Sequence, residues 1–593
     1  MQKLPLKMKM IMFTFMIVFM VIYSVLFGSK NAAIGIMIAM AGMMNLGNDM
    51  SFKPKVSFIK LTVMLLILGI ASFLNNPISI LGCILTFLVV FGATFTSYHL
   101  FSTSVYIPYL MCYFMMMCIP ISAEELPMRL ISLIFGAAFI VGINLLINKK
   151  KGHKLTKATL DSLILELNNA IDSKQNNEKI SKESFKAVNG FYLSMFSHFE
   201  YKYFPTPAQE AVLNVIKAFQ YIGWVIADSD LTDDELNYTK SILNNLESIE
   251  VSEIFKGIDV KTKEMNLILL NLEIIVNEIK KWDSLNDGII PDKKLIRESI
   301  KPILKREFSF RSAKFTFAFK MALVLTLWEV LTLAFNLPYT KWLYFASIPM
   351  MLPYVNDAAY NAKSRVTGTI VGVFIFALII ILMHYIPLSQ NILMMLIMVI
   401  SIFGMVYELE DTLKMTIFST LMSVMTSLMY ITLPEALTLK IIWVIVAVIV
   451  VSAINFGFLP YSVEKETKNN LKALLKLNES SIGLIRAKCM NKKIPNKTTL
   501  LIVSNLIREN IEVTDENREI YWIQMQITDI SNFILNYLDV HDFSGQAKDN
   551  LIRIIEHENA CEDYNDIYEK IMFYSTEYVV NILDREKELF EDI

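Results

Sequence analysis

The sequence predicts an all-α, polytopic membrane protein made of two parallel repeats, each with six transmembrane helices followed by a cytoplasmic helical domain. Hydrophobic residues make up 54% of the 593 residues and charged residues 19%, which is too apolar for an ordinary soluble protein. The apolar residues gather in two blocks of long runs, each run near the roughly 20 residues that a helix needs to cross a bilayer. Each block is followed by polar sequence with helical periodicity.

The first block fills residues 1–150 and contains six expected spans. They are residues 10–27, 32–47, 57–74, 78–95, 101–119 and 128–147. Lysines precede the first span and follow the second and the sixth, so the positive-inside rule places both ends of this block in the cytoplasm. The first run is too long for the apolar part of a signal peptide and lacks a cleavage site, so we expect it to be a membrane span.

Residues 151–310 form the first expected cytoplasmic helical domain. Leu160, Leu163, Leu167 and Ile171 have the spacing of one face of an amphipathic helix. The segment 232–235 (TDDE) predicts a capping box at the start of another helix.

A second block of six spans is expected in residues 311–460, and a second cytoplasmic helical domain in residues 461–593. The six spans are residues 315–336, 341–353, 366–386, 391–407, 413–430 and 438–459. Several features recur in the same order in both blocks, including a basic residue fifteen positions before an asparagine in the last span (Arg129 and Asn144, Lys440 and Asn455). Because an even number of spans inserts both halves the same way up, their pseudo-twofold axis should lie along the membrane normal.

The fifth span of each half carries a stripe of hydroxyl groups on one helix face. The stripes are Ser102, Tyr106, Tyr109 and Tyr113 in the first half and Thr416, Thr420, Ser423 and Ser427 in the second. Such stripes serve packing and hydrogen bonding between helices in many membrane proteins. Their duplicated placement also fits a path for a polar or aromatic solute, and both interpretations stay open.

Glu329 is the carboxylate that lies well inside an expected span. Acidic residues inside a membrane mark proton carriers or cation partners by default. Glu329 is therefore the candidate for energy coupling. The alternatives are a buried structural acid and an acid that reaches the outer interface beside Trp328.

Cations at two other places have a functional and a structural interpretation. Arg129 and Lys440 begin the sixth spans near the outer side, where they could attract an anion or pair with nearby glutamates. Arg365 is expected at the cytoplasmic start of the ninth span, where Asp357 and the acids of 408–411 could hold it as a latch or gate. Gly368 and Gly372, spaced for close helix packing, and Thr369 follow it.

Other classes of function lack support. The net charge of −2 and the absence of a basic stripe argue against a nucleic-acid partner. The five cysteines show no metal-ligand spacing, and we find no phosphate-binding loop or nucleophile elbow. We therefore expect no enzyme activity, no catalytic residues, no cofactor and no metal.

Residues 365–372 (RVTGTIVG) resemble the Arg-x-x-Gly-Thr-x-x-Gly signature of the FUSC family, the fusaric acid resistance proteins and aromatic acid exporters. The repeated layout is similar to that family over nearly the whole chain, although the third span lacks the signature. The resemblance implies a multi-pass plasma-membrane exporter of aromatic or other organic acid anions. Plant malate channels are distantly similar.

The leading hypothesis is a secondary exporter that works by rocking of two repeats, with both termini cytoplasmic. An organic anion channel and a non-transporting scaffold that docks partners through its cytoplasmic helices are the alternatives. The expected partners are the lipid bilayer and a small organic anion, and the sequence leaves a homo-oligomer open.

Overall fold

The computed structural model consists, in its described part, of α-helices joined by turns and loops. It describes residues 6–45, 50, 54–76, 78–97, 105–148, 151–176, 207–246, 248–255, 262–282, 307–310, 312–337, 340–353, 355–383, 390–408, 411–428, 432–458, 460, 462–492, 503–504, 507–508, 511, 513–514, 516–540, 542–560 and 567–591. No strand occurs in these ranges. The chain divides into two compact units, and each unit is assembled from separated segments.

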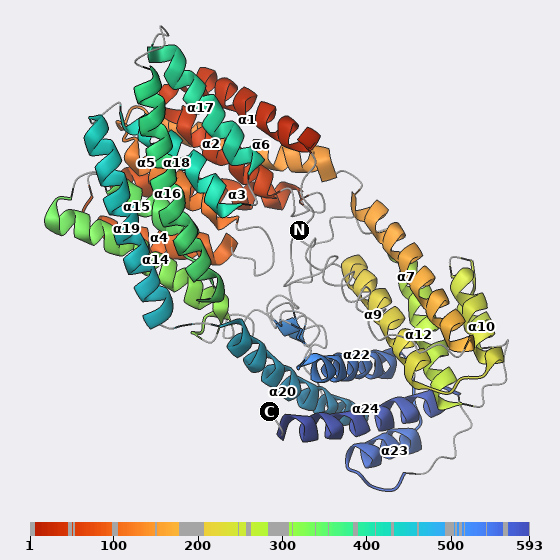
Figure 1. The fold of residues 1–593 in the computed structure, drawn as a ribbon. Coiled ribbons are helices and arrows are strands. Elements are labelled where there is room, and N and C mark those ends of the chain that lie inside the picture. The colour runs from red at the N-terminus through yellow and green to blue at the C-terminus, as the bar shows by residue number, and fades with distance from the viewer. Residues whose placement is uncertain are drawn as a thin grey trace. The chain divides into compact units, whose positions relative to one another are not determined.

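The first unit, here called the membrane unit, consists of Met1–Gly47, Pro54–Ile147 and Arg306–Val463. Its first-half helices are α1 (Leu6–Phe27), α2 (Ser29–Met44), α3 (Pro54–Leu74), α4 (Ile80–Ser97), α5 (Tyr106–Cys118) and α6 (Leu126–Asn148). Its second-half helices are α14 (Ala313–Phe335), α15 (Lys341–Met350), α16 (Val355–Met383), α17 (Gln390–Tyr407), α18 (Thr412–Ser427) and α19 (Leu433–Gly457) (Figure 1). Each expected span thus corresponds to one helix.

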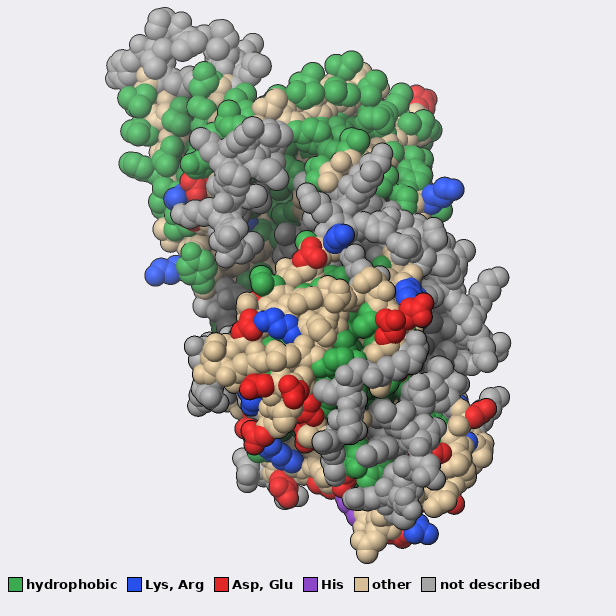
Figure 2. Space-filling model, turned by 90° about the vertical axis from the view of Figure 1, so that its right-hand side faces the viewer, with side chains coloured by type: hydrophobic (Ala, Val, Ile, Leu, Met, Phe, Trp, Pro, Cys, Tyr) green, Lys and Arg blue, Asp and Glu red, His purple; other side chains and the backbone are tan. Residues whose placement is uncertain are grey.

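Within the described residues, six helices of the membrane unit are long and apolar enough to cross a bilayer. They are α3, α4, α6, α14, α16 and α19, while α1, α2, α5, α17 and α18 contain shorter apolar stretches. Many large apolar side chains of this unit face outward, such as Val25, Ile80 and Phe374. Figure 2 shows hydrophobic side chains dominating the visible surface of this unit, whereas charged side chains gather on the other unit. An apolar surface of this extent is stable in lipid rather than in water.

Helices of the two halves pack against each other in a reciprocal pattern. Helix α4 packs against α14, and α17 packs against α1, so the fourth helix of each half contacts the first helix of the other. Helix α5 also contacts α15. These contacts place residues of both halves around common sites.

The helix that contains the ninth expected span begins before that span. Helix α16 starts at Val355, eleven residues before the predicted start at residue 366, so Arg365 lies within the helix and not at its first turn. The eighth span is shorter than predicted, because α15 ends at Met350, one residue after Pro349.

The second unit, here called the polar unit, consists of Asn48–Lys53, Asn148–Lys305 and Glu464–Ile593. Its helices are α7 (Lys151–Gln175), α9 (Pro207–Asp228), α10 (Asp233–Asn244), α11 (Val251–Ile254), α12 (Lys263–Ile279), α20 (Val463–Cys489), α22 (Arg518–Val540), α23 (Gly545–Ile555) and α24 (Ile567–Glu591). The predicted amphipathic face is confirmed, since Leu160, Leu163, Leu167 and Ile171 are all buried. The predicted capping box is confirmed at Thr232 and Glu235.

One hydrophobic core joins the two separated segments of the polar unit. Side chains of α7, α9 and α12 pack in the same cluster as side chains of α22, α23 and α24. Tyr537 Oη donates a 3.0 Å hydrogen bond to Glu273 Oε2, and Lys217 Nζ lies 3.1 Å from Asp529 Oδ1. The two polar segments therefore fold as one unit.

Candidate functional site

The carboxylate of Glu329 is buried where helices of the two halves meet. Glu329 lies on α14 with no solvent exposure. Thr86 Oγ1 on α4 donates a 2.8 Å hydrogen bond to Glu329 Oε1, and Asn75 Nδ2 lies 3.2 Å from each carboxylate oxygen. An acid from the second half is thus held by two polar groups from the first.

A hydroxyl chain extends from this carboxylate to the fifth helix. Thr86 Oγ1 and Tyr113 Oη lie 2.6 Å apart. Because the single hydroxyl proton of Thr86 is donated to Glu329, Tyr113 Oη donates to Thr86 Oγ1. The expected fifth-span stripe therefore reaches the expected coupling residue, and the chain Tyr113–Thr86–Glu329 can respond to the protonation state of the carboxyl group.

The turn after α3 positions Asn75 for this contact. Asn75 follows the last residue of α3, and its backbone N–H donates to Ala71 O. Gly82 on α4 leaves the necessary space, because a Cβ at Gly82 would lie 1.6 Å from Asn75 Oδ1.

The other members of the first stripe contact different elements. Tyr106 Oη donates to Met351 O across 3.4 Å, next to the end of α15. Tyr109 Oη accepts a 2.8 Å hydrogen bond from Asn45 Nδ2 at the end of α2. Ser102 lies outside the described residues.

The second stripe forms a packing seam. The hydroxyl groups of Thr416, Ser423 and Ser427 donate to carbonyl oxygens of their own helix, α18. A Cβ at Gly368 would lie 2.8 Å from Thr416 Cβ, and one at Gly372 would lie 2.8 Å from Thr420 Cβ. The close approach predicted for the two glycines is confirmed, and its partner is the second hydroxyl stripe.

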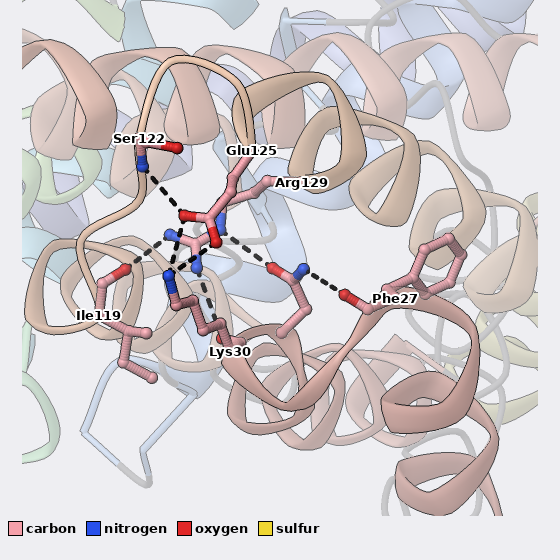
Figure 3. Close-up of polar contacts among 7 residues, drawn as sticks. Phe27, Lys30, Ile119, Ser122, Glu125 and Arg129 are labelled. Carbon is pink, nitrogen blue, oxygen red and sulfur yellow. Dashed lines mark hydrogen bonds and ion pairs between the residues drawn. The ribbon is translucent and has the colours of Figure 1, made fainter.

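Arg129 is buried and fully engaged by oxygen acceptors (Figure 3). Its Nε donates a 3.0 Å hydrogen bond to Asn31 Oδ1, and Nη1 donates a 2.8 Å bond to Ile119 O at the end of α5. Glu125, a predicted partner of Arg129, instead accepts from Lys30 Nζ at 2.7 Å. Because Lys30 stabilises its charged form, the pKa of Glu125 is lowered. These contacts tie the turn between α1 and α2 to the end of α5.

Arg365 has a different environment from that predicted. Its side chain is 8% exposed, and its Nε is buried without a hydrogen-bond partner. Two of the acids expected near it, Glu408 and Asp411, pair with Lys414 instead. The side chain of Asp357 lies outside the described part of the chain. Thr369, one turn further along α16, is buried as well.

Lys440 on α19 lies close to Arg365 in space. Its side chain is 7% exposed, with Nζ 5.6 Å from the centre of the Trp342 ring on α15. Helices α16 and α19 pack against each other, and the positive charges of Arg365 and Lys341 act on the Lys440 ammonium group. Glu435, the acid predicted to pair with Lys440, caps α19 by bonding to Thr432. Arg365 and Lys440 thus belong to one buried cationic pair.

Sequence reasoning missed three important groups: Asn75, Thr86 and Trp342. A polar residue directly after a span, as Asn75 is, signals a helix end and gives no indication of a partner on a distant helix. Among described residues, no group of three or more His, Cys, Asp or Glu side chains is arranged to hold a metal ion.

The apolar helices and the polar groups buried between them define a multi-pass membrane protein. Residues 324–454 match the family model described as fusaric acid resistance protein-like. The matched region contains Glu329, Arg365 and Lys440. No curated protein and no solved structure matched the chain.

Proposed function

We propose that this protein is a secondary transporter that exports aromatic or other organic acid anions from the cell by rocking of two six-helix repeats. It is a transporter and not an enzyme, and it acts in the plasma membrane with both termini and the polar unit in the cytoplasm. The substrate class follows the fusaric acid resistance protein-like domain at residues 324–454.

The observation that carries the proposal is the sign of the buried charge. Among described residues, the membrane unit buries four cationic side chains and one carboxylate: Arg129, Lys320, Arg365, Lys440 and Glu329. Ionisable groups are expensive inside a membrane and mark transport pathways when they occur there. A mainly cationic interior favours passage of anions over passage of cations.

The reciprocal packing supports the two-repeat mechanism. The contacts of α4 with α14 and of α17 with α1 are those that a twofold relationship between the halves would produce. Glu329 joins the halves at one of these contacts, because its partners Asn75 and Thr86 belong to the first half. A proton on Glu329 would change the hydrogen bonds between the halves, which is the requirement for coupling a proton to rocking.

Transport by purified protein in proteoliposomes tests the proposal. We expect a pH gradient to drive accumulation of radiolabelled 4-hydroxybenzoate, and protein-free liposomes measure the leak of the neutral acid. Glu329→Gln should abolish gradient-driven transport while retaining binding of the anion. Absence of protein-dependent flux for a panel of aromatic and aliphatic acids would contradict the function, whereas unchanged transport by Glu329→Gln would remove only the coupling role.

An anion channel is the second candidate, because a cationic interior suits a channel equally well. Single-channel currents far above carrier rates in planar bilayers would favour it over the rocking mechanism.

A further inference from the structure

Two buried cations, Arg365 on α16 and Lys440 on α19, lie far from the ends of their helices. Arg365 follows the first residue of α16 by ten positions and Lys440 follows that of α19 by seven. At 1.5 Å per residue these offsets are about 15 Å and about 10 Å. The part of α16 before Arg365 includes Asn356, Asp357 and Lys363, so Arg365 stands at the start of the apolar part of its helix. Lys440 lies within the apolar part of α19.

Neither cation has a compensating carboxylate among the described residues. The Nε atom of Arg365 is buried without an acceptor, and no hydrogen bond or ion pair joins its side chain to a described residue. Lys440 contacts the Trp342 ring. Burying a cation without a partner is costly, and a second cation nearby increases the cost.

Arg129 in the same unit shows what a structural buried arginine looks like in this protein. It is 1% exposed, yet Asn31 Oδ1 and the carbonyl oxygens of Met116, Ile119 and Lys30 accept from its guanidinium. The fold therefore gives every guanidinium nitrogen of Arg129 an acceptor and leaves Nε of Arg365 without one. An open arginine next to a lysine is the arrangement that an anionic ligand would complete.

We propose that Arg365 and Lys440 form the binding site for the carboxylate group of an organic anion, with Trp342 supplying an aromatic surface beside it. This inference rests on the proposed function and names the residues that bind its substrate. Arg365 offers a planar fork that matches a carboxylate, and Lys440 adds a second positive charge. Helices α15, α16 and α19 contact one another, so the three side chains are held by one group of helices.

The test measures binding and stability of the full-length protein in nanodiscs, with radiolabelled benzoate as the probe. We expect benzoate to bind wild-type protein and to raise its unfolding temperature, because a ligand of the folded state stabilises it. Arg365→Met and Lys440→Met should each weaken benzoate binding about tenfold or more. Lys440→Arg, which keeps the charge, should retain binding.

The stability of the ligand-free variants separates a binding site from a structural one. Arg365→Met and Lys440→Met should unfold at the same or a higher temperature than wild type, because each removes an uncompensated buried charge. Arg129→Met should unfold at a lower temperature, because it leaves several acceptors unpaired. Lower unfolding temperatures for Arg365→Met and Lys440→Met with undiminished benzoate binding would overturn the proposal.

Competition experiments test the chemical class of the ligand that Arg365 and Lys440 bind. Benzoate should be displaced by other aromatic carboxylates and less well by acetate or chloride, and equal displacement by chloride would overturn the carboxylate assignment. Binding that depends on Arg365 without any flux in proteoliposomes would contradict the transport function and leave this site standing. Flux in proteoliposomes together with benzoate binding that does not depend on Arg365 would overturn this binding site and leave the transport function standing.

Discussion

Thr86 Oγ1 on α4 donates a 2.8 Å hydrogen bond to the carboxylate of Glu329 on α14. This contact spans 243 residues of sequence and joins the two halves of the membrane unit inside a region with no solvent exposure. Because Tyr113 bonds to the same hydroxyl group, a single threonine connects the buried acid to the fifth helix.

We therefore expect Thr86→Val to disturb both stability and transport. The substitution keeps the shape of the side chain but removes the donor to Glu329 and leaves Tyr113 without its acceptor. A buried polar group that loses its partner costs about 1–3 kcal/mol. Thermal unfolding in detergent and proteoliposome transport rates measure the two effects.

Thr96→Val provides the matched control on the same helix. Thr96 is exposed and bonds to Gly92 O of its own helix, so both properties should stay near wild type. Equal effects of the two substitutions would contradict a specific role for the Thr86–Glu329 contact.

Gly82→Ala should displace Asn75 from Glu329. The added methyl group would lie 1.6 Å from Asn75 Oδ1, so the amide has to move and its hydrogen bonds to the carboxylate are lost. Gly92→Ala on the same helix meets no atom within 4 Å and is expected to be neutral or slightly stabilising, because alanine favours helix over glycine. Comparable transport rates for these two variants would show that the position of Asn75 is unimportant.

Gly372→Ala should loosen the seam between α16 and α18. Its Cβ would lie 2.8 Å from Thr420 Cβ and 3.0 Å from Ile417 O, and the backbone oxygen cannot move without shifting α18. Overpacking of this kind costs about 1–3 kcal/mol. We expect a lower unfolding temperature, with Gly142→Ala in α6, where nothing lies within 4 Å, as the control. A Gly372→Ala protein as stable as wild type would contradict the close packing.

The polar unit should lose stability as the pH rises from about 4.5 to about 7, because burial raises the pKa of Glu586 from 4.5 to about 7. In this interval the unfolded chain releases the proton while the folded chain retains it, so folding becomes less favourable with increasing pH. Above pH 7 the penalty is complete and amounts to about 3 kcal/mol at most.

Glu586→Gln should remove this dependence and make α24 more stable at pH 8. Hydrogen exchange followed by mass spectrometry, corrected for the intrinsic effect of pH, measures opening of α24 directly. Glu588→Gln is the control, since Glu588 lies on the same helix and is exposed. A pH profile unchanged by Glu586→Gln would assign the dependence to another group.

Local signals were sufficient to predict much of this structure. The capping box at Thr232, the buried face of α7 and the close approach at Gly368 and Gly372 each depend on residues within a few turns of one helix. The position of Glu329 inside a helix of the membrane unit followed from its place within an apolar run.

Local sequence patterns could not predict contacts between helices that are distant in the sequence. Asn75 and Thr86 meet Glu329 across 254 and 243 residues, and hydropathy contains no information about which helices become neighbours. Helix α16 extends upstream of the expected span because the polar residues before Arg365 continue the helix, while hydropathy marks only its apolar part. Arg365 therefore lies within the helix, directly before its apolar part.

The shared core of the polar unit has a consequence for biosynthesis. Helices α9 and α12 leave the ribosome roughly 240–380 residues before the α22 and α24 side chains that complete their core, which corresponds to some 10–80 s of synthesis at about 5–20 residues per second. During that interval helices α14–α19 are synthesised and inserted. The apolar faces of α9 and α12 stay uncovered until α22 and α24 have been made. The polar unit can therefore complete its fold only after α14–α19 have been synthesised. A nascent chain that stalls within α14–α19 would expose the uncovered apolar faces of α9 and α12 to chaperones and proteases.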